Sequence, residues 1–252
     1  MSCKRPMLAL TLAISALWGA GAQAADLVVS AAASLTNAFK DVAQGYEKEH
    51  PGTRVVLNFG ASDVLLQQIV KGAPADVFAS ADQKAMDKAV EEKAVRRDSR
   101  VDFAANQIVL IVPADSKANI TSLNDLTRAD VKRIAYGNPA SVPVGRYTQG
   151  ALEAAGLWTA VQAKSVLAQN VRQSLDYVSR GEVDAGFVFA TDAAIMPDKV
   201  KVALRVPSQT PVTYPIAVTA REAAAQEAQR FVAYVLSPAG QAILARYGFQ
   251  QP

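Results

Sequence analysis

Two serine residues follow predicted strands at positions where their hydroxyl groups could donate hydrogen bonds to a bound anion. Ser34 ends the segment AAAS directly after one strand, and Ser62 ends the segment GAS after the next. A helix start leaves backbone N–H groups without internal partners and carries partial positive charge, so an anion fits there without a cationic side chain. A single serine of this kind is more typical of an ordinary helix N-cap. Two of them, both preceded by small residues, favour a shared site.

Two later junctions between a strand and a helix offer backbone chemistry. In the segment NPASVPVG, Pro143 fixes the backbone before a predicted helix and Gly145 permits close approach, although a plain rigid turn would use the same residues. In the segment NVR, Asn170 is a candidate N-cap and Val171 provides an early N–H group without a helical partner. We expect these junctions to join the two serines if the strands share one sheet edge or face one cleft.

Alternating strands and helices must position the junctions. The predicted strands cover 26–30, 54–59, 76–79, 107–112, 133–136, 185–189 and 216–218, and the predicted helices cover 35–49, 64–70, 86–92, 145–155, 171–180 and 222–236. This alternation predicts an α/β protein with mostly parallel sheets and flanking helices. In such sheets ligands bind beyond the carboxyl ends of the strands, where the helices begin.

Two apolar runs, 106–112 and 212–218, could carry the chain between two lobes. We expect one lobe to contain 25–108 and 213–252, and the other to contain 109–212. An exported chain with two such hinge crossings suggests a binding protein that closes on a small solute.

The N-terminus has the layout of a secretory signal peptide. A short basic start at Lys4 and Arg5 precedes an apolar run from about residue 7 to about residue 21, and the run ends in a small-x-small site at Ala24. We expect cleavage after Ala24, which removes the lone cysteine. An uncleaved N-terminal anchor is the alternative, but the apolar core is short for a membrane span. No later stretch reaches that length, so we expect a soluble exported product.

Composition excludes several classes of function. The 252 residues include 26 Lys plus Arg and 23 Asp plus Glu, and a net charge of +3 produces no field typical of nucleic-acid binding. One Cys and one His leave no disulfide framework, no Cys/His zinc site and no spare histidine for a serine nucleophile.

Five segments together resemble the periplasmic molybdate-binding proteins of ABC transporters: AAASLTNAF (31–39), GAPADVFASAD (72–82), GNPASVPVGRY (137–147), NVR (170–172) and RYGF (246–249). The resemblance implies a two-lobed type II periplasmic binding protein with a hinged cleft, which binds one molybdate or tungstate ion as an oxyanion. It also implies a periplasmic location, a monomer, a membrane permease and an ATPase as partners, no cofactor and no metal held directly by side chains.

The same resemblance implies the ligand-binding residues. The family's two serines correspond to Ser34 and Ser62, and its two backbone amides correspond to Val144 and Val171. The family's tyrosine corresponds to Phe189, which can line the pocket but has no hydroxyl to donate. A lost hydrogen bond to a charged group costs about 1.5–3 kcal/mol, or roughly tenfold to a hundredfold in affinity. The candidate replacement donors are Thr191, Tyr147, Asn37 and a trapped water.

Charged residues near these segments are expected to stay out of the pocket. We expect Asp63 to point outward, and Arg146 and Arg172 to face outward or to brace the mouth. Oriented N–H and O–H dipoles would then hold the dianion, and a site with donors only favours a fully ionised oxyanion over hydrogen phosphate. Ion size would separate molybdate and tungstate from sulfate.

Three alternatives remain open from the sequence. The nearest is a binding protein for another tetrahedral oxyanion such as sulfate or thiosulfate, which the phenylalanine at 189 keeps open. A ferric-ion binding protein would need Tyr, His and carboxylate ligands, and His50 is the single histidine. An exported hydrolase is a remote alternative, because Ser34 and Ser62 lack a G-x-S-x-G elbow and a histidine base.

Overall fold

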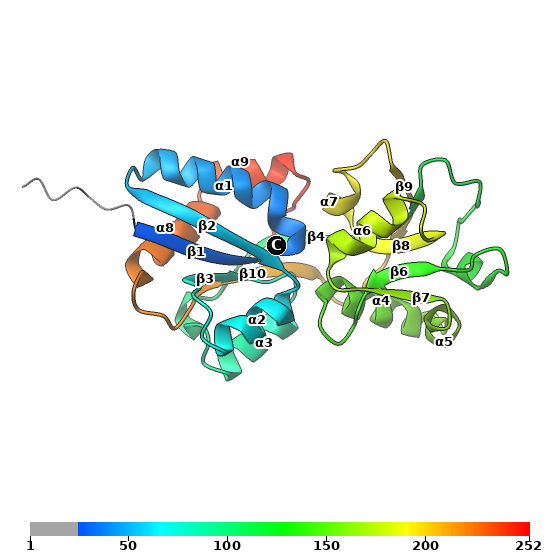
Figure 1. Cartoon of the computed structure of the whole chain (residues 1–252), viewed down its shortest axis with the longest axis horizontal. Coiled ribbons are helices and arrows are strands. Elements are labelled where there is room, and N and C mark those ends of the chain that lie inside the picture. The colour runs from blue at the N-terminus through cyan, green and yellow to red at the C-terminus, as the bar shows by residue number, and fades with distance from the viewer. Residues whose placement is uncertain (1–24) are drawn as a thin grey trace, which may run out of the picture.

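The computed structural model describes residues 25–252, so the predicted signal peptide lies outside the described residues. The chain forms two lobes, each built on a five-stranded sheet with helices on both sides (Figure 1). This two-lobed α/β architecture confirms the predicted fold class. Within residues 25–252, no helix combines the length and the apolar character that a membrane crossing requires.

The first lobe contains both ends of the described chain. Its strand order is β2-β1-β3-β10-β4, with β1 parallel to β2 and β3, and with β10 antiparallel to both of its neighbours. The elements are β1 (Ala25–Ala32), α1 (Thr36–Glu49), β2 (Thr53–Gly60), α2 (Ser62–Val70), β3 (Val77–Ala79), α3 (Gln83–Glu91), β4 (Val101–Asn106), β10 (Val212–Val218), α8 (Ala225–Leu236) and α9 (Pro238–Arg246).

The second lobe repeats this arrangement. Its strand order is β7-β6-β8-β5-β9, with β6 parallel to β7 and β8, and with β5 antiparallel to both of its neighbours. The elements are β5 (Ile108–Pro113), β6 (Ile134–Gly137), α4 (Pro143–Ala154), α5 (Trp158–Gln162), β7 (Ser165–Ala168), α6 (Val171–Ser179), β8 (Ala185–Phe189), α7 (Ala190–Ala193) and β9 (Val200–Val206). In each lobe a helix follows each of the three strands that pair in parallel, and the strand that enters from the other lobe runs antiparallel to its neighbours.

The chain crosses between the two sheets twice. Ile108 already pairs with Phe189 and Val206 in the second sheet, and Val212 already pairs with Asn106 in the first. β5 thus begins in the second sheet at residue 108, and β10 returns the chain to the first sheet at residue 212. The short linkers between β4 and β5, and between β9 and β10, lie beside each other because β4 and β10 are paired neighbours.

Burial explains why the central strands are so apolar. Every residue of β8 is buried, as are the first five of β5, because helices cover both faces of the sheet. Helix α1 shows the helical spacing expected from the sequence, since Phe39, Val42 and Tyr46 are all fully buried against the first sheet. The carboxyl ends of β1, β2 and β8 lie at the junction between the lobes, where Ala32, Gly60 and Phe189 come close together.

Candidate functional site

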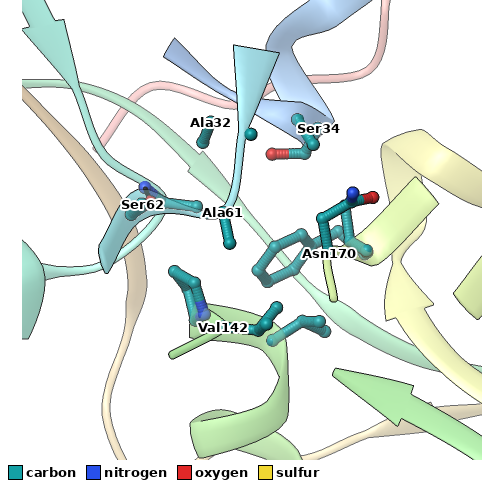
Figure 2. Close-up of a pocket in the computed structure, with 13 residues that line it drawn as sticks. Ala32, Ser34, Ala61, Ser62, Val142 and Asn170 are labelled. Carbon is teal, nitrogen blue, oxygen red and sulfur yellow. Dashed lines mark hydrogen bonds between the residues drawn. The ribbon is translucent and has the colours of Figure 1, made fainter. Parts of the chain in front are cut away.

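A small pocket lies between the lobes, where the four predicted junctions meet (Figure 2). Ser34, Ser62, Val144, Val171 and Phe189 all line it. The other lining residues are Ala32, Ala33, Gly60, Ala61, Ala81, Val142, Pro143 and Asn170. The structure thus brings together every residue that the sequence placed in the candidate site.

Ser62 is fully buried and is the first residue of α2, but its side chain does not cap that helix. The backbone N–H of Ala81 donates to Ser62 Oγ at 3.1 Å. Within residues 25–252 the Ser62 hydroxyl has no acceptor for its own proton. The hydroxyl is therefore free to donate to a molecule in the pocket.

Ser34 lies in the 3-10 turn Ala33–Leu35 that precedes α1, and it does not cap a helix either. Its Oγ lies 3.0 Å from the hydroxyl oxygen of Tyr214, a residue of β10. The ordinary N-cap interpretation of both serines is thus contradicted by the geometry.

Two helices of the second lobe start at the pocket with unpaired backbone amides. Val144 follows Pro143 in the first turn of α4, and Val171 is the first residue of α6. Neither N–H has a hydrogen-bond acceptor among the described residues. Asn170 caps α6 as expected, because its side chain accepts from Gln173 N at 3.0 Å. Both amides can therefore donate to an anion, assisted by the helix dipoles.

Gly145 allows α4 to start at this position. A Cβ atom on Gly145 would lie 1.9 Å from the carbonyl oxygen of Gly137, at the end of β6. The close approach predicted from the sequence is thus an approach to the sheet, and it fixes where the Val144 amide points.

Phe189 lines the pocket and is 1% exposed. None of the three side chains expected to replace the absent hydroxyl lines the pocket. Thr191 accepts from Asn106 Nδ2 at 2.9 Å, Asn37 accepts from Arg172 at 2.8 Å, and Tyr147 borders a separate cavity at the lobe junction. The sequence-based suggestion of these three donors is therefore not supported by the geometry.

Arg146 of α4 crosses the lobe junction and binds two carboxylates of the first lobe. Its guanidinium lies 2.6 Å from both Asp63 and Asp82, and the three side chains are 13%, 14% and 5% exposed. The expectation that Asp63 points outward is wrong, because Asp63 turns toward this arginine. Burial raises the pKa of Asp82, and the positive charge of Arg146 opposes that rise. Arg146 therefore braces the lobes beside the pocket without lining it.

Arg172 of α6 makes the second connection between the lobes. It donates to Asp192 of its own lobe at 2.6 Å, and to Asn37 Oδ1 and the Ser34 carbonyl of the first lobe at 2.8 and 3.2 Å. Both arginines are thus neutralised by carboxylates. Among the described residues, no Lys or Arg lines the pocket.

Asp192 should make the protein less stable as the pH rises from about 4 to about 6. It is fully buried, its Oδ2 has no partner within residues 25–252, and burial raises its pKa from 3.8 to about 6 despite Arg172. Between these pH values the native state binds more protons at Asp192 than the unfolded chain does, so its contribution to the unfolding free energy falls by about 3 kcal/mol. We expect urea unfolding of the wild type minus that of Asp192→Asn to show this fall. A difference independent of pH would contradict the assignment.

The pocket is too small for an organic ligand. Its cavity volume is only about 10 Å³, whereas sites for drug-sized ligands measure hundreds of Å³. Its polar lining includes two hydroxyls and two unpaired backbone amides that can donate, together with the Asn170 side chain that caps α6, and its remaining surface is mostly Ala, Val and Phe carbon. Such an arrangement can bind a small anion, and its lining contains no side chain that could act as a general base.

Three contributors to this geometry were not recognised from the sequence. Ala81 orients Ser62, while Asn106 and Tyr214 lie behind Ser34 in the two crossing strands. The signal for the last two was present, because each carries hydrogen-bonding groups in a crossing run that is mainly apolar. Their partners are 85 to 180 residues away in the chain, so only the fold shows what they contact.

Residues 27–250 match the model of a family described as bacterial extracellular solute-binding protein. The molybdate-binding protein ModA of Escherichia coli is 39% identical over 234 residues, which cover 88% of this chain and 88% of that protein. The molybdate-binding protein ModA of Haemophilus influenzae is 34% identical, and the match covers 98% of each chain.

Solved structures show the same two-lobed fold. The periplasmic molybdate-binding protein of Azotobacter vinelandii matches with a TM-score of 0.78 and 26% identity, covering 90% of this chain and 99% of that one. The sulfate-binding protein SubI of Mycobacterium tuberculosis matches with a TM-score of 0.79, covering 90% and 87%, but at 17% identity it shows only the shared fold.

Proposed function

The chain belongs to the family of bacterial extracellular solute-binding proteins, and we propose that it binds molybdate or tungstate for an ABC importer. In this proposal the hydroxyls of Ser34 and Ser62 and the amides of Val144 and Val171 hold the oxyanion, with Phe189 as an apolar wall. The molybdate-binding relatives at 34–39% identity over most of the chain support the ligand class. The binding protein itself carries out no catalysis in this proposal.

One observation carries the proposal: a small pocket between the lobes presents donors from both lobes and no charged side chain. A dianion can be stabilised there by oriented dipoles in a site without bulk water. An anion that keeps a proton, such as hydrogen phosphate, would need an acceptor, and the lining side chains and free amides supply donors.

Closure of the lobes would complete the site. The two serines come from the first lobe and the two amides from the second, so all four donors meet only when the lobes are together. Binding of the oxyanion would thus stabilise the closed form, and we propose that this form is presented to a membrane permease and its ATPase. We further propose that the mature protein is a periplasmic monomer.

Titration calorimetry with molybdate, tungstate, sulfate and phosphate tests the ligand assignment. We expect saturable binding of molybdate and tungstate, weaker binding of sulfate, whose shorter bonds leave the four donors too far apart, and no heat with phosphate. Tight sulfate binding without molybdate heat would overturn the assignment and favour the alternative of another tetrahedral oxyanion, with which the absent hydroxyl at Phe189 is compatible.

A further inference from the structure

We propose that Tyr214 is a positioning residue for the oxyanion site, because its hydroxyl donates to Ser34 and directs the Ser34 proton into the pocket. The inference rests on the proposed function and extends it to a residue that does not line the pocket. It is carried by a chain of hydrogen bonds whose direction can be worked out from the donors involved.

The chain starts at a backbone group that can only donate. The N–H of Gln107 donates to Asn106 Oδ1 at 2.9 Å, which fixes the orientation of the Asn106 amide. Its Nδ2 must then donate to its neighbours, which are Thr191 Oγ1 at 2.9 Å and the Tyr214 hydroxyl oxygen at 3.3 Å. The Tyr214 oxygen is thus an acceptor toward Asn106.

Because the Tyr214 oxygen accepts from Asn106, the Tyr214 proton is available for a hydrogen bond to Ser34. The Tyr214 hydroxyl is fully buried, and burial raises its pKa well above 10, so the proton stays on the oxygen. The only remaining oxygen in hydrogen-bond range among the described residues is Ser34 Oγ at 3.0 Å. With Asn106 donating from one side, Tyr214 donates to Ser34 on the other.

Ser34 is left with a proton and no protein acceptor for it. Its oxygen receives a hydrogen bond from Tyr214, as the oxygen of Ser62 receives one from Ala81 N–H. Each serine oxygen therefore accepts a hydrogen bond from a protein group outside the pocket, and each serine proton can be donated only to a molecule in the pocket. Successive bonds in such a chain polarise one another, so Ser34 becomes a stronger donor. The Tyr214 hydroxyl thereby strengthens anion binding through Ser34, at a site where Phe189 has no hydroxyl of its own to donate.

Aromatic packing holds the Tyr214 ring independently of its hydroxyl. The ring centroid lies 5.5 Å from Phe249, 5.7 Å from Phe189 and 6.3 Å from Phe103. Removing only the hydroxyl should leave these contacts intact, which makes Tyr214→Phe a clean test. The chain also begins where the strand crosses between lobes and touches Thr191 of the second lobe, so it is complete only with the lobes in this arrangement.

A double-mutant cycle on Tyr214→Phe and Ser34→Ala, with molybdate affinity measured by calorimetry, tests the inference. Tyr214→Phe should weaken binding about tenfold in the wild type and less than about twofold when Ser34 is already Ala, because the tyrosine acts through the serine. Tyr46→Phe is the matched control. It also removes a buried phenol hydroxyl and its hydrogen bond in the first lobe, away from the pocket, and should leave affinity unchanged.

The outcomes separate this inference from the proposed function. If the wild type binds molybdate and Ser34→Ala weakens it, but Tyr214→Phe binds within twofold of the wild type, the positioning role is wrong and the function stands. An equal loss from Tyr214→Phe in both backgrounds would likewise overturn it, since the effect would not pass through Ser34. If the wild type binds none of the tetrahedral oxyanions, the proposed function fails first. The increase in Tm on adding molybdate is a second measure of affinity, because a ligand that binds only the native state raises Tm.

Discussion

Replacing Ser34 and Ser62 together by alanine is expected to weaken molybdate binding by about a hundredfold to ten-thousandfold. Each serine contributes one hydrogen bond to a charged ligand, and such a bond is worth about 1.5–3 kcal/mol, or roughly tenfold to a hundredfold in affinity. The two side chains come from different segments of the first lobe and share no hydrogen bond with each other. Their effects should therefore nearly add.

Ser30→Ala is the matched control for the double serine variant. Ser30 is also a buried serine of the first lobe, and its one side-chain contact is a long hydrogen bond of 3.5 Å from Asn58. It does not line the pocket, so calorimetry should give the wild-type affinity. If the double variant also kept the wild-type affinity, the oxyanion would have to bind elsewhere. Thermal unfolding without ligand would show whether any loss comes from the fold.

The strands that the sequence predicted best are those whose burial is complete. β5 and β8 are continuous apolar runs covered on both faces, and the prediction for β8 has the observed limits. β7 was missed because this edge strand is short and leaves Leu167 about half exposed. β9 reads VKVALRV, an apolar segment with charged residues at Lys201 and Arg205 that is typical of a half-exposed strand and could have been recognised. The apolar content of a segment therefore predicts a strand best when helices bury both faces of that strand.

The candidate site was predictable to the extent that its chemistry is local. Ser34, Ser62 and Val171 stand at junctions whose small residues and turn residues are visible in short segments of sequence. Ion pairs between the lobes are a different matter. Arg146 contacts carboxylates 83 and 64 residues earlier in the chain. Because the sequence does not show this partner, it predicts that the carboxylate of Asp63 turns away from an anion site.

The position of the Val144 amide depends on a glycine, and Gly145→Ala is expected to have the largest effect on stability. The new Cβ would lie 1.9 Å from the Gly137 carbonyl oxygen and 2.6 Å from its carbon. Backbone atoms cannot rotate away as a flexible side chain can, so the start of α4 must move off β6. We expect the unfolding free energy to fall by about 3 kcal/mol, at the upper end of the usual cost of overpacking.

Molybdate affinity should fall with it, because Val144 precedes the altered residue and the Val144 amide moves with the start of α4. Losing that amide as a donor would cost about tenfold to a hundredfold in affinity. Gly150→Ala is the control within the same helix, since a Cβ at Gly150 meets no atom within 4 Å. There the exchange should raise the unfolding free energy by about 0.5–1 kcal/mol, because alanine favours a helix interior over glycine. Equal unfolding free energies for the two variants in urea would show that α4 does not pack against β6 at Gly145. Close packing at Gly145 would then not fix the position of the Val144 amide.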